Sequence, residues 1–165
     1  MACLGIAAFC RQKERSPMNQ TTKKRVLILC TANSARSQMA EGILRWLAGD
    51  RYEVFSAGSK ATFVHPLAIR VMAEIGADIS NQQSKTYEQF IGQSFDAVIT
   101  VCDAANESCP FLPGQYRRIH WSFPDPAAVE GEEAKLHAFR QVRDGLIEKF
   151  KLFIQTDHEL GHVKA

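Results

Sequence analysis

The sequence predicts an α/β fold, a single domain in which a four-stranded parallel sheet is flanked by helices. One observation is that short apolar runs rich in Val, Ile and Leu recur along the chain, as in strands that are buried on both faces. A second is that segments with apolar residues at helical spacing lie between these runs or after them. Strands that alternate with helices in this way are typical of a parallel sheet.

Length and composition limit the class of protein. At 165 residues the chain is long enough for one substantial core. The net charge is only +2, and the sequence has no basic tract and no apolar run of membrane length, so we expect neither nucleic acid nor a membrane as a partner. The 5 cysteines and the lack of a secretory signal pattern predict a reducing, cytoplasmic location, and we expect a monomer.

The two ends of the chain differ from its middle. Residues 1–22 carry neither a strand pattern nor a turn pattern, so we expect them to form a disordered extension. The folded domain is expected to span residues 23–156, and residues 157–165 are expected to form a tail. The sequence has no internal repeat.

The first predicted unit is a strand, a loop and a helix. Residues 26–29 are apolar and favour a buried strand, and a loop of small and polar residues leads from there to Arg36. The apolar residues that follow at helical spacing are Met39, Ile43, Leu44, Trp46 and Leu47. Residues 52–57 alternate enough to favour a second strand near the edge of the sheet. Pro66 suits the first turn of a second helix, which Gly76 ends.

The second half of the chain follows the same pattern. Residues 81–94 are polar and favour a weakly buried, lid-like element with a short helix. Residues 95–101 form another apolar run, which predicts the third strand, and residues 103–114 are expected to follow as a loop. A shorter fourth strand is expected at residues 118–121, with His120 in the strand core. The last elements are a rigid loop at residues 123–126 and a long amphipathic helix at residues 132–154.

The spacing between Cys30 and Arg36 indicates chemistry. A short loop that enters a helix directs several backbone N–H groups into one concavity, and the helix dipole adds partial positive charge there. A tetrahedral oxyanion suits such a site, because Arg36 can donate a planar fork to two of its oxygens while the same field favours the thiolate of Cys30. Ser37 can donate a hydroxyl hydrogen bond to the Cys30 sulfur. The alternative is a buried cysteine beside a surface arginine, and the strand before and the helix after favour the anion site.

Three further side chains are expected at the same crevice, because an open α/β sheet binds ligands outside the carboxyl ends of its strands. Cys102 ends the third strand and Cys109 lies in the loop after it, and two cysteines that face a third suggest thiol exchange. Asp125 can donate a proton to a leaving oxygen, although an aspartate between two prolines is also a common turn residue. No Cys or His spacing typical of zinc is present, so no metal is expected.

Three motifs together produce a resemblance to a known family. They are LCTANSARSQMAEG at residues 29–42, VCDAANESCP at residues 101–110 and HWSFPDP at residues 120–126. With them, the chain resembles the thioredoxin-coupled arsenate reductases, which are built on the low-molecular-weight protein tyrosine phosphatase fold. The three-cysteine arrangement is the discriminating feature. A plain phosphatase of this fold has no need of Cys102 and Cys109.

The resemblance implies a thiol relay that reduces arsenate to arsenite. In such a relay Cys30 attacks arsenate with Asp125 as the proton donor, Cys102 then attacks Cys30, and arsenite leaves as a disulfide forms. Cys109 next attacks Cys102, and thioredoxin reduces the second disulfide as an external thiol reductant. No bound cofactor is implied, and the segment from residue 84 to residue 113 would have to rearrange.

The resemblance also implies which residues form the anion loop and which support it. The oxyanion would be bound by Thr31, Ala32, Asn33, Ser34, Ala35, Arg36 and Ser37. In some family members, the residues equivalent to Asn33, Glu41 and Ser56 join an aspartate to hold a potassium ion. Lys85 stands at the position of that aspartate, so we expect its ammonium group to take the place of the ion.

Two other functions remain open from the sequence. A low-molecular-weight protein tyrosine phosphatase would need only Cys30, Arg36 and Asp125, and such enzymes usually carry Asp-Pro-Tyr where this chain has Asp-Pro-Ala. Residual phosphatase activity is also compatible with the relay. A non-enzymatic arsenite or redox sensor would bind stably without catalytic turnover.

Overall fold

The centre of the structure, a computed structural model that describes residues 22–107 and 112–162, is one sheet. Its four strands are all parallel and lie in the order β2-β1-β3-β4, which confirms the predicted sheet. The extension expected at the N-terminus lies almost entirely outside the described residues.

The central strand is β1, Lys24–Cys30, whose apolar residues are almost fully buried. It pairs on one side with β2, Tyr52–Gly58, which lies at the sheet edge as predicted, and on the other with β3, Ala97–Thr100. The fourth strand is β4, Arg117–His120. Because the strands are parallel, the chain leaves β1 and β3 at the same edge of the sheet, where Cys30 and Cys102 lie.

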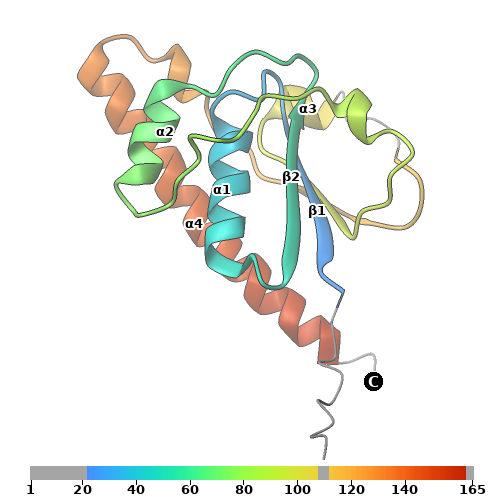
Figure 1. The fold of residues 1–165 in the computed structure, drawn as a ribbon. Coiled ribbons are helices and arrows are strands. Elements are labelled where there is room, and N and C mark those ends of the chain that lie inside the picture. The colour runs from blue at the N-terminus through green and yellow to red at the C-terminus, as the bar shows by residue number, and fades with distance from the viewer. Residues whose placement is uncertain (1–21, 108–111, 163–165) are drawn as a thin grey trace, which may run out of the picture.

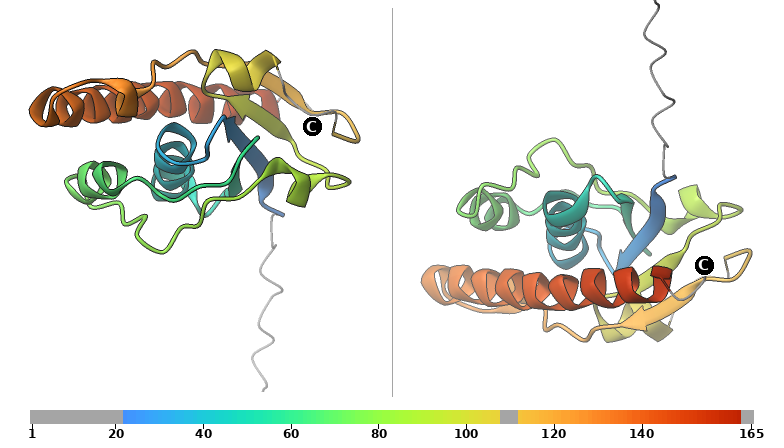
Figure 2. Two further views of the ribbon diagram at one scale, coloured as in Figure 1. Left: turned by 90° about the horizontal axis from the view of Figure 1, so that it is seen from above. Right: turned by 90° about the horizontal axis from the view of Figure 1, so that it is seen from below.

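Three helices pack against one another, and the first of them also packs against β1 and β2. They are α1, Arg36–Ala48; α2, Pro66–Ala73; and α4, Glu132–His162. Figure 2 shows α1 between α2 and the sheet, with the long α4 running across both. The amphipathic patterns predicted all three, because the apolar stripe of each helix is the face it buries.

The segment at residues 81–94 is weakly buried, as expected, except at Phe90. It contains one short 3-10 helix, η1, Tyr87–Phe90. Phe90 is buried, because its ring packs 5.5 Å from the ring of Phe55 and 6.0 Å from that of Phe95. The expectation of weak burial is therefore wrong at this residue.

The chain after β3 also differs from the prediction. Residues 103–114 were expected to form a loop, yet they begin with a short helix, α3, Asp103–Glu107. Its first turn is closed by the N–H of Asn106, which donates to the carbonyl of Cys102 at 3.1 Å. A five-residue helix has too few apolar positions to show a periodic pattern.

The expected tail is helical as far as His162, because α4 continues through it. Asp157 explains the extra turns. Its carboxylate accepts hydrogen bonds from Lys24 at 2.8 Å, from Arg117 at 3.2 Å and from the Tyr52 hydroxyl at 2.7 Å. These contacts join α4 to the first residues of three strands. Burial acts to raise the pKa of Asp157, but the hydrogen bonds from Lys24 and Tyr52 outweigh it and the pKa is lowered.

Replacing Asp157 by Asn should lower the free energy of unfolding at pH 7 by about 2 kcal/mol, the range for hydrogen bonds to a charged group. A carboxylate whose pKa is lowered by folding stabilises the protein above its unfolded pKa, near 4, and this contribution is lost as the pH falls through the folded value. The difference from wild type, measured by urea unfolding, should therefore shrink below pH 4. The exposed Asp50→Asn variant serves as the control. A difference that stays constant down to pH 2 would contradict this assignment.

Candidate active site

The loop between β1 and α1 surrounds the sulfur of Cys30, which is 3% exposed. The sulfur accepts a hydrogen bond from the backbone N–H of Asn33 at 3.2 Å and lies 2.8 Å from the Ser37 hydroxyl. Asn33 has a φ of 45°, in the left-handed region, which turns its N–H back toward the sulfur. The structure therefore brings Cys30, Asn33 and Ser37 together.

Every backbone carbonyl of residues 31–35 accepts a hydrogen bond from a donor that lies outside the loop. The donors are Lys60 N–H and the Ser59 hydroxyl for Thr31, the Thr62 and Ser84 hydroxyls for Ala32, Gln38 for Asn33, His65 N–H for Ser34, and Met39 N–H for Ala35. The segments that supply most of them follow β2 and α2. This outward pairing of the carbonyls fixes the shape of the loop.

Gly58, the last residue of β2, lies directly behind the loop. A Cβ atom at this position would lie 2.5 Å from the carbonyl oxygen of Thr31 and 2.8 Å from the backbone nitrogen of Asn33. Both neighbours are backbone atoms that cannot turn aside. Glycine is needed here because it permits the loop and the strand to approach this closely.

Buried polar side chains support the loop from below. The amide nitrogen of Asn33 donates to the hydroxyls of Ser37 at 2.8 Å and Ser56 at 2.9 Å. The Ser56 hydroxyl donates in turn to the carboxylate of Glu41. Among the residues that the structure describes, no buried side-chain nitrogen or oxygen lacks a hydrogen-bond partner. The network can therefore be buried without an orphaned polar group.

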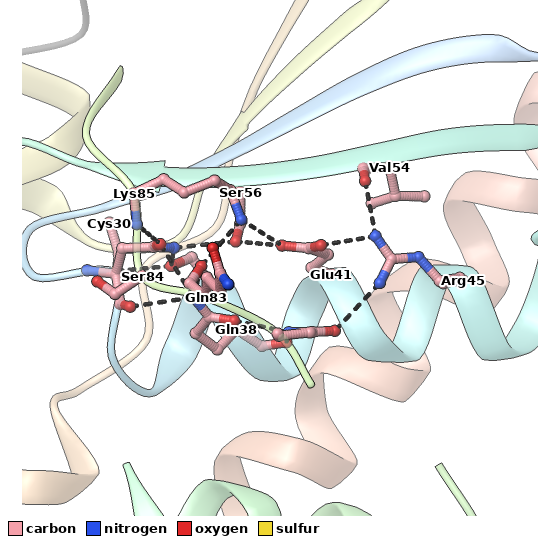
Figure 3. Close-up of polar contacts among 12 residues, drawn as sticks. Cys30, Gln38, Glu41, Arg45, Val54, Ser56, Gln83, Ser84 and Lys85 are labelled. Atoms are coloured by element: carbon pink, nitrogen blue, oxygen red, sulfur yellow. Dashed lines mark hydrogen bonds and ion pairs between the residues drawn. The ribbon is translucent and has the colours of Figure 1, made fainter. Parts of the chain in front are cut away.

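The carboxylate of Glu41 lies between two cations. Lys85 Nζ is 3.8 Å from one carboxylate oxygen, and Arg45 Nη2 is 2.6 Å from the other. Figure 3 shows both groups converging on Glu41 from opposite sides. Lys85 was expected from the sequence and Arg45 was not, although the i,i+4 spacing of Glu41 and Arg45 on α1 is a signal for such a pair.

Arg36 and Asp125 meet at the mouth of the loop. Arg36 donates from Nη1 to the carbonyl of Phe123 at 3.0 Å, and its Nη2 lies 3.6 Å from Asp125 Oδ2. Asp125 is half-exposed and accepts a hydrogen bond from the N–H of Ala127 at 3.1 Å, which caps the 3-10 helix η2, Pro126–Ala128. The turn role and the site role of Asp125 are therefore compatible.

Cys102 lies beside the loop, two residues after the end of the neighbouring strand β3. The N–H of Val101 donates to the carbonyl of Leu29 at 2.9 Å. This hydrogen bond holds the chain after β3 next to the end of β1, so Cys102 lies close to the loop that begins at Cys30. The Cys102 sulfur is 3.5 Å from the Thr31 hydroxyl. Cys30 and Cys102 are both free thiols and both buried. Cys109 lies outside the described residues.

His120 is exposed, so its expected place in the strand core is wrong. One ring nitrogen lies 2.8 Å from the Thr100 hydroxyl and the other lies 2.9 Å from the carboxylate of Asp103. β4 is an edge strand, and an edge position leaves room for a polar side chain to reach α3. Hydrogen bonds from Ser122 and His120 lower the pKa of Asp103.

His65 also supports the loop, although no sequence pattern indicated it. Its Nδ1 accepts a hydrogen bond from the N–H of Leu67 at 3.1 Å and so caps α2, while its own backbone N–H holds the carbonyl of Ser34. Burial, together with the charge of Lys135, lowers the pKa of His65. The neutral ring suits its role as an acceptor at the helix cap.

The described residues contain no group of three His, Cys, Asp or Glu side chains placed to hold a metal ion. Over the same part of the chain, none of the helices combines the length and the apolar character that crossing a membrane requires.

Comparison with known proteins identifies the family. Residues 25–161 match the model of the low molecular weight phosphotyrosine protein phosphatases. The chain therefore belongs to this family. It is 47% identical to an arsenate reductase of Halalkalibacterium halodurans, over 81% of this chain and 97% of that protein, and 43% identical to an arsenate reductase of Bacillus subtilis, over 81% and 96%. Within the family it groups with these arsenate reductases.

Solved structures agree with this grouping. An arsenate reductase in its oxidized state matches with a TM-score of 0.71 at 34% identity, over 81% of this chain and 98% of that one. A thioredoxin-dependent arsenate reductase of Corynebacterium glutamicum matches with a TM-score of 0.61 at 28% identity, over 82% and 64%. A tyrosine phosphatase of Erwinia amylovora, at 17% identity with a TM-score of 0.67 over 84% and 96%, shows the shared fold alone.

The two cations on Glu41 lead to a prediction about potassium. We expect the melting temperature to be equal in sodium and potassium chloride, because Arg45 and Lys85 already neutralise the buried carboxylate. Lys85→Asp should make the melting temperature rise in potassium alone, since a second carboxylate would complete an oxygen-lined site. The matched control is Lys60→Asp at an exposed lysine. A wild-type melting temperature that rises with potassium and not with sodium would rule the idea out.

Proposed function

We propose that this protein reduces arsenate to arsenite by a three-cysteine relay and is regenerated by thioredoxin. The observation that carries the proposal is the position of Cys102, whose sulfur lies 3.5 Å from the Thr31 hydroxyl in the loop around Cys30. A phosphatase mechanism needs no second cysteine there. The relatives named arsenate reductases, at 47% and 43% identity, support the same substrate.

Arsenate would bind in the loop of residues 31–37. The loop carbonyls are held from outside, which leaves backbone N–H groups to line the concavity at the start of α1. Arg36 would donate its fork to two arsenate oxygens. Because the Phe123 carbonyl and Asp125 already contact Arg36, its guanidinium group is oriented across the mouth of the loop before substrate arrives.

In the first step the Cys30 thiolate attacks arsenic. An S–As bond forms and one As–O bond breaks, and the departing oxygen takes a proton from the carboxyl group of Asp125 and leaves as water. Asp125 is half-exposed and lies at the open side of the loop, where a leaving oxygen can meet it. Arsenic remains As(V) in this adduct.

In the second step the Cys102 thiolate attacks the Cys30 sulfur. An S–S bond forms and the S–As bond breaks, and its electron pair passes to arsenic, which becomes As(III) and leaves as arsenite. Cys109 would then attack Cys102 and release Cys30 as a thiolate. A thioredoxin dithiol supplies two electrons and two protons to the last disulfide. Such a relay needs a reducing compartment, so we propose a cytoplasmic location.

The direct test is arsenate-dependent oxidation of NADPH in the presence of thioredoxin and thioredoxin reductase. Wild-type protein should sustain many turnovers, and Cys30→Ser should give none. Replacing arsenate with an aryl phosphate tests the phosphatase alternative in the same samples. Stable arsenite binding without NADPH oxidation would identify a sensor instead, and aryl phosphate hydrolysis without arsenate reduction would identify a phosphatase.

The relay order makes a second prediction. Cys109→Ser should complete one turnover and accumulate a Cys30–Cys102 disulfide, because the step that returns Cys30 is lost. Cys102→Ser should release no arsenite through the relay. Mass mapping of disulfides after a single addition of arsenate distinguishes the two variants. Absence of the Cys30–Cys102 disulfide in Cys109→Ser would show that the proposed order is wrong.

A further inference from the structure

A row of side-chain amides leads from the surface of the protein to Cys30. Gln82 donates from Nε2 to Gln38 Oε1 at 2.6 Å, and Gln38 donates from Nε2 to Asn33 Oδ1 at 2.9 Å. Asn33 then donates to the Ser37 hydroxyl, which lies 2.8 Å from the Cys30 sulfur. Figure 3 shows Gln38 close to Gln83 and below the residues around Cys30. Gln38 is completely buried.

Backbone groups determine which way these amides face. Gln38 Nε2 also donates to the carbonyls of Asn33 at 3.1 Å and Gln83 at 3.0 Å, and a carbonyl can only accept. The backbone N–H of Lys85 donates to Asn33 Oδ1 at 2.7 Å, and an N–H can only donate. The NH₂ group of Gln38 must therefore face the loop, and the amide oxygen of Asn33 must face Gln38.

The orientation of Asn33 determines the direction of the Ser37 hydroxyl. With its oxygen held by Gln38 and Lys85, Asn33 presents its NH₂ group to Ser37, so the Ser37 oxygen accepts. The single Ser37 proton is then available to the Cys30 sulfur. If the Asn33 amide turned over, its oxygen would draw that proton away and the thiolate would lose a donor.

We propose that Gln38 is a positioning residue that, together with the backbone N–H of Lys85, fixes the orientation of the Asn33 amide and thereby directs the Ser37 hydroxyl at the Cys30 thiolate. Gln38 does not touch the reacting atoms and acts through two intermediates. The inference rests on the proposed role of Cys30 as the nucleophile. It adds that the reactivity of the Cys30 thiolate depends on the Gln38 amide, which is separated from the sulfur by the side chains of Asn33 and Ser37.

The outer end of the row reaches a partly exposed residue. Gln82 Oε1 accepts a hydrogen bond from Arg45 Nη1 at 3.4 Å, which directs the Gln82 NH₂ group toward Gln38. A carboxylate in place of the Gln82 amide would face the Gln38 oxygen and repel it. A substitution at the half-buried Gln82 would therefore disturb the hydrogen bonds between the amides without any change inside the loop.

The test measures alkylation of Cys30 by iodoacetamide across a range of pH, with the Cys30 peptide followed by mass spectrometry. Gln38→Glu and Gln38→Met both remove the donor, and we expect each to slow Cys30 alkylation at pH 7 by about threefold to tenfold and to move the rate profile to higher pH. Gln82→Glu should have a smaller effect in the same direction. Gln141→Glu, at an exposed glutamine of α4, is the matched control and should leave the rate unchanged.

A Ser37→Ala background separates hydroxyl direction from loosening of the loop. Without the hydroxyl, Gln38→Met should have no further effect on Cys30 alkylation. A slowdown of equal size in both backgrounds would overturn the proposal, as would wild-type rates in both Gln38 variants. If the Gln38 variants fail to fold, Gln82→Glu decides, and a wild-type rate there overturns the proposal. These rates need no arsenate, so they stay distinct from failure of the arsenate assay.

Discussion

The structure depends on hydrogen bonds from other segments that hold the loop of residues 31–35 in its shape. The carbonyls of residues 31–35 are turned outward, and each must find a donor elsewhere, since a buried carbonyl without one is costly. Donors come from the segment after β2, from the segment before η1 and from the first turns of α1. The arrangement of these segments follows from the need to satisfy the outer side of the loop.

The parallel sheet places the second thiol at that loop. Two neighbouring parallel strands end at the same edge, so β1 and β3 bring Cys30 and Cys102 into one region although they are far apart in sequence. An antiparallel pair would have placed these strand ends at opposite edges. Thiol exchange between strand ends is therefore a chemistry that this topology favours.

The sheet and the loop could be predicted because they rest on signals within the sequence. Apolar runs identify β1 and β3, and the spacing of Cys30 and Arg36 identifies the loop. The burial of Gln38 could not be predicted, because a glutamine inside a helical pattern is typical of an exposed position. The burial of Phe90 and the exposure of His120 depend on how separate segments pack, which local patterns do not contain. Asp157 was missed for the same reason.

The ends of the described chain lie far from the loop. β1 begins and α4 ends at the edge of the sheet opposite Cys30, and Figure 1 shows this separation. There the ion pair between Asp157 of α4 and Lys24 of β1 joins the two elements. A fusion partner or a surface tether joined beyond α4 would leave the mouth of the loop open to small oxyanions. A protein immobilised through this end would keep the loop around Cys30 on the side that faces the solution.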